Sequence, residues 1–497
     1  MRPNGTVRLT LHDYATDPYL RQKDGVNLAH ENIASLFRQD HAGVDIAFHD
    51  FNRLLSDADY AVEILSNTDV VVANVGPHAH YYFYLRAQHG LDFAIIRDVR
   101  TAVWSGYLLQ EHLCQPYLRA SDTLLVASVY TRAVCHRLFP HLRHHALVQA
   151  YPLTVGFPAS QARRPSPDRS QPLVLGYIGR LSEDKNFHDI VELLIRLNEH
   201  ADRTYMLLAC GDVHSGSCDP AVISRKIAAH LGQGEYFRYL PTRSNGEIWA
   251  LYEQMDVLLF PSTSNLETLG RVLVEASHAG VPVVCGRHAA AVELVPEAQL
   301  CPVTYFTGQT FDCHGDHPLG TIAVEDMAEV IMKVPLRSGS CHEEARFRPP
   351  RFMQVVTRDV DGLSKDSLNL LHPSQQQFVD SLEVDLPHPL SLVQADAAIR
   401  KMLPRFLGLQ SQDRSVREDH WAELLVLSRR PDRTRRFIEA ARHSRGDFTN
   451  VGGIDMELCH IVGFYPSFHL APDAVRCKVC ASPWVNARAV RPRRPAV

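Results

Sequence analysis

Two acidic side chains, Glu267 and Glu275, lie eight residues apart in the segment NLETLGRVLVEASHAGVPVV, residues 265–284. Apolar residues around Glu275 recur at the spacing of an amphipathic helix, and Glu267 stands at its expected start. Eight residues of helix span about 12 Å, so the carboxylates cannot share one proton as a catalytic dyad does. They are better suited to bind hydroxyl groups on two parts of one polar ligand. The structural alternative is that Glu267 favours a helix N-terminus and Glu275 is an ordinary surface residue.

Two cationic side chains, Arg180 and Lys185, lie in the segment GRLSEDKN at residues 179–186. The segment follows an apolar run at residues 173–178, an expected strand, and precedes an expected helix. Gly179 permits close approach of the backbone, and cations beside a helix N-terminus suit a diphosphate group. The alternative is that both cations are exposed loop charges.

A third group of charged residues, Arg97 and Asp98, follows the buried run at residues 93–96. Charges at the end of a buried strand are costly unless they are paired, so these two form either a structural ion pair or part of a site. Two further expected loops, residues 12–26 and 74–80, carry charged groups and histidines that could bind an anion or a sugar hydroxyl.

The elements that must position these residues alternate between short apolar runs and helix-length segments. The expected strands of the first part are residues 7–11, 44–48, 70–74, 93–96, 124–128 and 146–149. Those of the second part are residues 173–178, 205–209, 236–240, 257–260 and 282–285. Strict alternation predicts α/β domains with parallel, doubly wound sheets, whose ligands bind at the carboxyl ends of the strands.

The expected domain boundary is residues 157–172, a linker rich in proline, serine and arginine. It separates a first Rossmann-like domain at residues 1–156 from a second at residues 173–335. Residues 336–497 are expected to hold an insertion followed by a mainly helical extension.

The composition limits the classes of function. Of 497 residues, 45% are hydrophobic and 22% are charged, and the formal net charge of −5 argues against a nucleic-acid-binding surface. No run reaches the roughly 20 apolar residues of a membrane-spanning helix, and we recognise no signal peptide, so we expect a cytoplasmic protein without an integral membrane segment. The CxxC pair Cys477 and Cys480 lacks the second pair of a structural zinc site. A nicotinamide cofactor is not indicated, because no GxGxxG segment joins a strand to a helix.

Several motifs of the second part occur in a fixed order. They are GRL and KN within residues 179–186, CGD at 210–212, FPS at 260–262, the two acidic residues with Gly270 between them, and GVPVV at 280–284. In this order and spacing, residues 173–294 resemble the retaining GT-B glycosyltransferases of family four, also called group 1. The resemblance implies a GT-B fold, in which two doubly wound domains face a cleft and a C-terminal helix crosses back to the first domain.

The resemblance also implies roles for the site residues. Arg180 and Lys185, on the loop that begins at Gly179, would bind the diphosphate of a nucleotide-sugar donor. They would stabilise the negative charge that develops there as the glycosidic bond breaks. No metal and no cofactor besides the donor itself is implied.

The other site residues would bind the remaining parts of the donor. Glu275 would bind the ribose hydroxyls, and Glu267 would bind hydroxyls of the donor sugar. The backbone amides of Leu269 and Gly270 would lie near the sugar and the phosphate.

The chain departs from the family pattern in three places. Asp24-Gly25 replaces a glycine pair, and Arg97 stands where the family has a histidine, which makes Arg97 the candidate catalytic residue on the acceptor side. The loop at residues 286–293 carries alanines where the family favours glycines, although Glu293 is in the expected place.

The sequence therefore predicts a metal-independent hexosyltransferase that uses a nucleotide-sugar donor, with a UDP-sugar as first choice. The acceptor would be a hydroxyl of a small molecule or a glycan, the anomeric configuration would be retained, and the arginine-rich composition favours bacterial biosynthesis. A GT-B phosphorylase or epimerase is one alternative. A catalytically degenerate GT-B protein that binds a nucleotide sugar or a partner enzyme is the other; Arg97 favours it, and the complete set of donor-site residues argues against it.

Overall fold

The structure is a computed structural model that describes residues 5–13, 25–38, 43–73, 78–99, 106–158, 171–200, 202–232, 235–306, 318–333, 347–358, 371–382 and 389–406. Most of the expected linker, much of the loops expected at residues 12–26 and 74–80, and the CxxC pair lie outside them.

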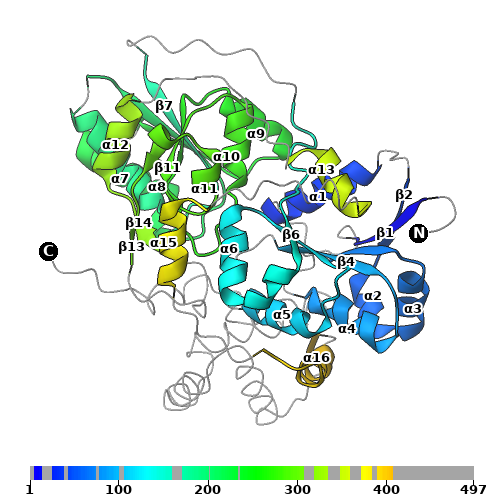
Figure 1. Ribbon diagram of the computed structural model, residues 1–497. Coiled ribbons are helices and arrows are strands. Elements are labelled where there is room, and N and C mark those ends of the chain that lie inside the picture. Colours follow the sequence, from blue (N-terminus) through cyan, green and yellow to red (C-terminus); the bar gives the residue numbers. More distant parts are fainter. Residues whose placement is uncertain are drawn as a thin grey trace, which may run out of the picture.

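The first domain is built on a parallel sheet with the strand order β2-β1-β3-β4-β5-β6 (Figure 1). Its strands are β1 (Val7–His12), β2 (Val44–His49), β3 (Val70–Ala73), β4 (Ala94–Val99), β5 (Thr123–Val126) and β6 (Ala146–Val148). The central strand β3 reads VVVA and is buried throughout. Helices cover both faces of such a sheet, so its central strands need continuous apolar runs rather than alternating ones.

Several helices of the first domain begin where short polar side chains cap them. They are α1 (Gly25–Arg38), α2 (Phe51–Ser56), α3 (Ala58–Ser66), α4 (His80–Gln88), α5 (Gly106–Cys114) and α6 (Val129–Leu138). Asp50 accepts hydrogen bonds from backbone N–H groups at the start of α2, Asp57 does so for α3, and Ser128 does so for α6. Each capping side chain accepts hydrogen bonds from N–H groups of the first helical turn, which have no carbonyl partner within the helix.

A buried ion pair joins α4 to the turn before β5. Arg86 makes a bidentate contact with Asp122, with N–O distances of 2.6 and 2.8 Å. The guanidinium also donates to the carbonyl groups of Phe93 and Tyr117, and Asp122 accepts from the amide of Ile95. These additional hydrogen bonds offset the desolvation of the two charges.

The second domain repeats the design on a parallel sheet with the strand order β12-β11-β10-β7-β8-β9. Its strands are β7 (Leu173–Ile178), β8 (Tyr205–Cys210), β9 (Phe237–Leu240), β10 (Val257–Phe260), β11 (Val283–Gly286) and β12 (Leu300–Cys301). A small antiparallel pair consists of β13 (Thr304–Tyr305) and β14 (Gly320–Thr321). The helices are α7 (Phe187–His200), α8 (Pro220–Leu231), α9 (Asn245–Tyr252), α10 (Arg271–His278), α11 (Ala291–Leu294) and α12 (Val324–Lys333).

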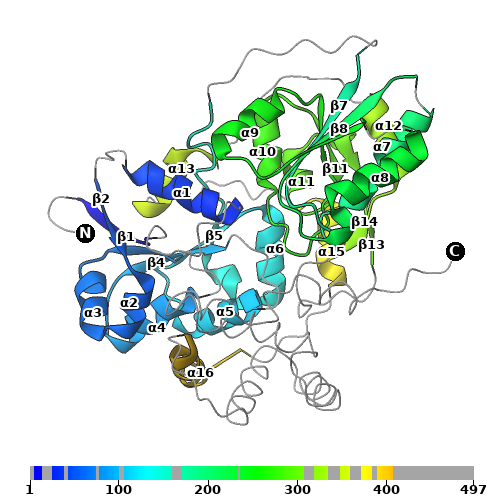
Figure 2. The same ribbon diagram turned by 180° about the vertical axis from the view of Figure 1, so that it is seen from behind.

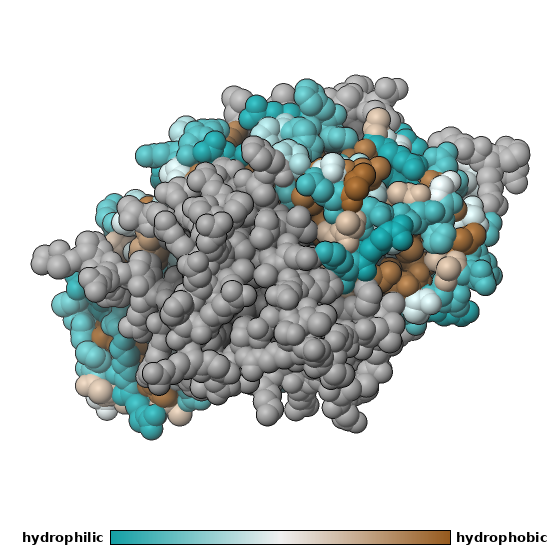
Figure 3. Space-filling view, turned by 90° about the horizontal axis from the view of Figure 1, so that it is seen from below, coloured by the Kyte–Doolittle hydropathy of each residue, from teal (hydrophilic) through white to brown (hydrophobic). Residues whose placement is uncertain are grey.

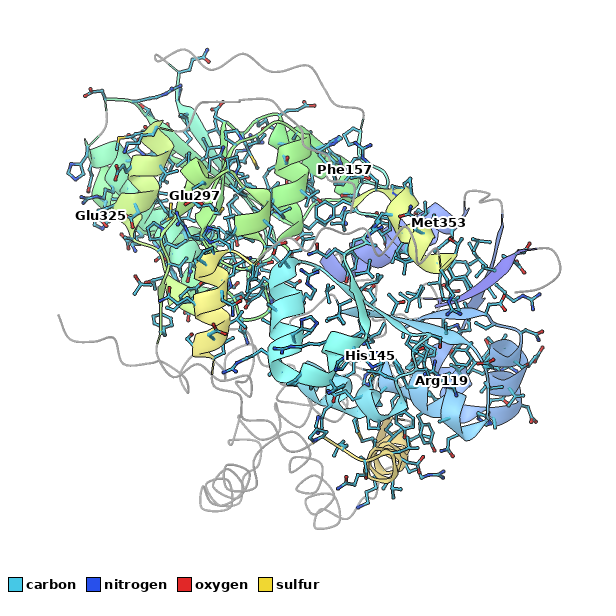
Figure 4. All side chains as sticks on the ribbon, viewed as in Figure 1. Arg119, His145, Phe157, Glu297, Glu325 and Met353 are labelled. Atoms are coloured by element: carbon cyan, nitrogen blue, oxygen red, sulfur yellow. The ribbon has the colours of Figure 1, made fainter. Side chains whose placement is uncertain are left out.

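Aromatic contacts accompany the passage of the chain from one domain to the other. Phe157, labelled in Figure 4, packs against Trp249 and His278 of the second domain, with ring centroids 4.7 and 4.9 Å apart. After the second domain, α13 (Pro349–Val356) returns to lie beside α1, where Phe352 packs on Phe37 at 5.8 Å between ring centroids. Both views in Figures 1 and 2 show α13 next to α1.

Two more helices of the C-terminal part contact the domains. In α15 (Pro373–Ser381), Phe378 stacks on Tyr305 of the second domain and Tyr130 of the first, with ring centroids 4.1 and 6.4 Å apart. In α16 (Leu392–Phe406), Ala395 and Ile399 join the apolar core of the first domain against α4 and α5. α15 therefore packs against both sheet domains, and α16 packs against the first.

The predicted α/β fold of two doubly wound sheets is confirmed, and the described part of residues 336–497 is helical as expected. Among the described residues, no helix combines the length and the apolar character that crossing a bilayer requires. On the face drawn in Figure 3, the described surface is mainly hydrophilic and its apolar residues lie in small groups.

Candidate active site

The candidate site lies at the carboxyl edge of the second sheet, where loops follow β7, β8 and β10. The loop at residues 179–186 follows β7. Because β7 lies between β10 and β8, this loop lies between the loops that follow those two strands. The amide of Gly179 donates to the carbonyl of Cys210 at 2.9 Å, and the amide of Leu181 donates to the carbonyl of Asp212 at 2.8 Å. A Cβ on Gly211 would lie only 1.9 Å from the carbonyl oxygen of Gly179, so these two loops require a glycine at residue 211.

Lys185 and Glu267 meet across two of these loops. The Lys185 ammonium lies 2.7 Å from Oε2 of Glu267, and the Ser262 hydroxyl donates to the same oxygen at 3.0 Å. Burial alone would raise the pKa of the Glu267 carboxyl, but the charge of Lys185 and the two hydrogen bonds lower it overall. The two residues predicted to bind diphosphate and donor sugar are therefore brought into direct contact.

Arg180 pairs with a carboxylate that the sequence did not single out. Its guanidinium lies 3.2 Å from Oδ2 of Asp184, which is buried, while the Arg180 side chain remains 35% exposed. Burial would raise the pKa of Asp184, but the charges of Lys185 and Arg180 and a hydrogen bond from Ser182 lower it overall. Two cations and two carboxylates, including Glu267, thus balance each other in the structure.

Asn186 holds the Lys185 loop against the loop that carries Glu267. Its backbone adopts a positive φ of 53°, a region that asparagine tolerates better than most residues. Its side-chain amide donates to the carbonyl of Pro261 and to the Thr263 hydroxyl, both at 2.9 Å. Asn186 therefore fixes the separation of Lys185 from Glu267.

The helix that follows Glu267 begins later than expected. α10 starts at Arg271 with Gly270 as its N-cap at φ 72°, so Glu267 lies in the preceding loop, and the predicted separation of about 12 Å along one helix does not apply. The reason is Gly270, because a Cβ there would lie 2.9 Å from the Phe260 ring and the left-handed backbone cannot continue a helix. Within the described residues, no hydrogen bond uses the amides of Leu269 and Gly270, which leaves both donors available at the N-terminus of α10.

Glu275 is buried in α10, so the alternative that made it a surface residue is wrong. Its Oε1 accepts a hydrogen bond from Nε of Arg271 at 2.6 Å, and its Oε2 accepts one from the Tyr252 hydroxyl at 2.9 Å. Burial and the neighbouring Glu275 carboxylate raise the pKa of Tyr252 well above its usual value. An ionised carboxylate accepts up to about four hydrogen bonds, so Glu275 keeps capacity for further donors.

Arg97 lies within β4 rather than in the loop after it, which corrects the predicted strand end. Its guanidinium forms a buried ion pair with Glu111 of α5 and donates to the carbonyl groups of Ala73, at 3.2 Å, and of Asp98. The carboxylate partner is therefore Glu111, not the side chain of Asp98 as the sequence suggested. The acceptor-side role of Arg97 stays a prediction.

Sequence reasoning missed Asp184, Ser262 and His288 as residues of this region. Asp184 had one usable signal, its position four residues after Arg180, which is the spacing of a local ion pair. Ser262 lies in the same loop as Glu267, five residues earlier, and belongs to a motif that the sequence showed without a role for the serine. His288 follows β11, which lies beside β10 in the sheet, so no local pattern marks it. In the described part of the chain, no group of three histidine, cysteine or acidic residues is placed to hold a metal ion.

Residues 159–312 match the family described as Glycosyl transferases group 1. The matched range contains Arg180, Lys185, Glu267 and Glu275. These residues form a group 1 glycosyltransferase domain. The family that the motif order resembles is thereby confirmed, and the glycosyltransferase domain coincides with the second sheet and its site.

The curated relatives of the glycosyltransferase domain differ in substrate. The D-inositol 3-phosphate glycosyltransferase of Corynebacterium urealyticum is 30% identical over 115 residues, which cover 23% of this chain and 27% of that protein. The glycogen synthase of Mycobacterium tuberculosis is 29% identical over 193 residues, which cover 38% of this chain and 44% of that protein. The chain thus matches less than half the length of these relatives.

Among solved structures, HepE (Alr3699) of Anabaena in complex with UDP and glucose is 15% identical. The superposition has a TM-score of 0.45 and covers 80% of this chain and 99% of that chain.

Proposed function

We propose that this protein transfers a sugar from a nucleoside diphosphate sugar to a hydroxyl group of an acceptor and retains the anomeric configuration. A UDP-sugar is our first choice of donor, and a small molecule or a glycan is our expected class of acceptor. The observation that carries the proposal is the contact between Lys185 and Glu267 within the glycosyltransferase domain. It joins the loop that we expect to bind phosphate to the carboxylate that we expect to bind the donor sugar.

The ion pairs of the site suggest how the donor diphosphate binds. Asp184 neutralises Arg180, and Glu267 neutralises Lys185. A diphosphate offers both cations stronger, multidentate acceptors and competes with the two carboxylates. The amides at the N-terminus of α10 add donors of their own. Binding therefore releases Glu267 from part of its contact with Lys185, and the freed oxygen accepts a hydroxyl of the donor sugar.

The ribose would bind at Glu275, one turn after the start of α10. Glu275 is held in place by Arg271 and Tyr252, so its carboxylate is oriented before any ligand arrives. Its remaining lone pairs would accept the two ribose hydroxyls.

The reaction breaks the bond between the anomeric carbon and the diphosphate oxygen and forms a bond from that carbon to the acceptor oxygen on the same face. The acceptor hydroxyl loses its proton to the departing phosphate oxygen, so atoms and charges balance. Arg180, Lys185 and the α10 amides stabilise the negative charge on the leaving diphosphate, which is the electrostatic contribution expected to dominate. We assign no metal or other cofactor to this step and place the reaction in the cytoplasm.

Donor turnover tests the proposal. Nucleotide sugars would be incubated with the protein and with pools of sugars and phosphorylated polyols, and proton NMR would follow loss of the donor and the coupling constant of each new anomeric proton. We expect one donor to be consumed only when an acceptor is present, with its anomeric configuration kept in the product. Phosphate-dependent consumption, acceptor-independent conversion of the donor, or an inverted product would contradict the proposal.

A further inference from the structure

Ser128 of the first domain contacts the loop that carries the donor-site amides of the second. It is the N-cap residue of α6 and its side chain is fully buried. Its hydroxyl donates to the carbonyl of Thr268 at 2.8 Å, across 140 residues of sequence. Figures 1 and 2 both show α6 at the edge of the first domain that faces the second. A contact between the domains therefore reaches the residue two positions before Gly270, the N-cap of α10.

The direction of the Ser128 hydroxyl proton follows from its partners. A carbonyl oxygen only accepts, so the single proton of Ser128 points at Thr268. The Ser128 oxygen accepts from the amide of Thr131 at 3.0 Å. The Thr131 hydroxyl, 2.9 Å away, then also donates to Ser128, because the Ser128 proton is already in use. One oxygen therefore caps α6 and donates to the second domain.

The backbone next to Ser128 is also held by the second domain. The Glu293 carboxylate of α11 accepts from the amides of Val129 and Tyr130, both at 3.0 Å. Three consecutive residues of the first domain thus contact α11 and the loop before α10. These contacts fix the position from which the Ser128 hydroxyl reaches Thr268.

The Thr268 carbonyl and the Leu269 N–H belong to the same peptide unit. A peptide unit is planar and trans, so its N–H points away from its C=O. A hydrogen bond that holds the carbonyl toward Ser128 therefore also fixes the direction of the Leu269 N–H. No helical hydrogen bond fixes this peptide, because α10 begins only at Arg271. Within the described residues, no hydrogen bond uses the Leu269 N–H.

We propose that Ser128 is a positioning residue of the donor site, whose hydrogen bond to Thr268 orients the Leu269 N–H toward the donor diphosphate. This inference rests on the proposed function and gives a residue of the first domain a part in donor binding. An amide that is oriented before the ligand arrives binds an anion without a cost of reorganisation. Without the Ser128 hydroxyl, the peptide loses this restraint and part of that advantage.

The test separates the diphosphate from the nucleoside. Ser128→Gly removes the hydroxyl at little cost to α6, because glycine is tolerated at an N-cap. Calorimetry would measure the dissociation constants of UDP and uridine, and likewise of GDP with guanosine and ADP with adenosine. We expect Ser128→Gly to bind the diphosphate about tenfold more weakly and the nucleoside unchanged, since only the diphosphate meets the amide. Asp57→Gly, which removes the N-cap of α3, is the matched control and should change neither constant.

A conservative variant completes the test. Ser128→Thr keeps a hydroxyl at the N-cap and should bind the diphosphate more tightly than Ser128→Gly does. Equal weakening of diphosphate and nucleoside by Ser128→Gly, no change in either, or equally weak diphosphate binding by both variants would overturn the positioning role and leave the proposed function intact. A wild type that binds no nucleoside diphosphate would overturn both.

Discussion

At the scale of single residues, the donor site is a balanced set of charges rather than a cluster of cations. Lys185 is paired with Glu267, and Arg180 with Asp184. The pairing stabilises the folded protein, since an unpaired buried charge would be costly. Because each cation is paired with a carboxylate, one substitution in this set can change diphosphate binding and sugar binding in opposite directions.

Lys185→Ala and Glu267→Gln should therefore separate two functions. Removing the ammonium of Lys185 should weaken binding of the nucleoside diphosphate by about tenfold or more, because a charge-assisted contact is lost. Glu267→Gln removes the competitor for Lys185, so diphosphate binding should stay unchanged or become tighter, while sugar transfer falls about tenfold to hundredfold. Titration calorimetry and initial rates would measure both. Weaker diphosphate binding in Glu267→Gln, to the extent seen in Lys185→Ala, would refute this division.

Acid should destabilise the wild type through Glu267. The pKa of this carboxyl is lower in the folded protein than its ordinary value of 4.5, so its contribution to stability is full above that value and is lost as the pH falls through the folded pKa. The difference in melting temperature between the wild type and Glu267→Gln should thus narrow as the pH falls from about 7 to below about 4. Thermal unfolding across this range measures it, and a constant difference would contradict the assigned charge state.

For single residues, the sequence predicted which residues belong to the candidate site better than it predicted which residues they contact. The residue types and their spacing singled out Arg180, Lys185, Glu267 and Glu275, because cations on a strand-to-helix loop and acidic residues near a helix are readable locally. It did not predict that Arg97 pairs with Glu111, since that contact joins a strand to a helix fourteen residues away and depends on tertiary packing.

At the scale of elements, α6 of the first domain is joined to the donor loops of the second. The Glu293 carboxylate accepts hydrogen bonds from the amides of Val129 and Tyr130, both at 3.0 Å, and the Ser128 hydroxyl donates to the carbonyl of Thr268 at 2.8 Å. The N-terminus of α6 is thus satisfied by a carboxylate from the other domain. Thr268 directly precedes the amides proposed to bind phosphate, so this contact links the domain interface to the donor site.

Glu293→Ala should destabilise the folded protein because this contact is lost. Loss of a helix-capping carboxylate should lower the free energy of unfolding by about 1–2 kcal/mol, because the two amides lose their acceptor. Urea denaturation would measure the change. Glu63→Ala, on the exposed side of α3, is the matched control and should stay within about 0.5 kcal/mol of the wild type. Equal effects of both substitutions would show that the Glu293 contact contributes nothing.

The helices and strands were predictable where apolar residues recur with a clear period. They were less predictable where a single residue determines the start or end of an element. The late start of α10 follows from Gly270, and the two-residue strand β12 is too short to give a pattern. Ala289 adopts a positive φ of 47°, which explains why the family favours glycine in this loop. The sequence showed the alanine but not the backbone angle it must adopt.

At the scale of the whole molecule, α15 contacts both sheet domains. Phe378 of α15 contacts Tyr130 from the first domain and Tyr305 and His288 from the second. The amide of Gln375 in the same helix donates to Glu293 at 3.2 Å. α15 therefore packs where the two domains meet.

Phe378→Ala should test that role. Removing a buried aromatic ring should lower the free energy of unfolding by about 3–5 kcal/mol through lost burial and a new cavity. Gln376→Ala on the exposed side of α15 is the control and should have little effect. Chemical denaturation of both variants gives the comparison, and equal stability of the two would show that α15 does not hold the domains.

The overall architecture was the most predictable level, because alternating strand and helix periods in both halves allow few topologies. The resemblance implied a C-terminal helix against the first domain, but it did not show which surfaces α13, α15 and α16 cover, since an amphipathic helix shows which of its faces is buried but not what covers that face.

Binding of a nucleoside diphosphate tests the central claim most directly. A thermal-shift panel of UDP, GDP, ADP, TDP and CDP would be run on the wild type and on Arg180→Ala. A ligand at about a hundred times its dissociation constant stabilises the folded state by about 2.7 kcal/mol, which moves the melting midpoint by a few degrees. The account predicts that one nucleotide, with UDP first, shifts the wild type and not the variant. Absence of any shift in the wild type would contradict the donor site and favour a catalytically degenerate protein.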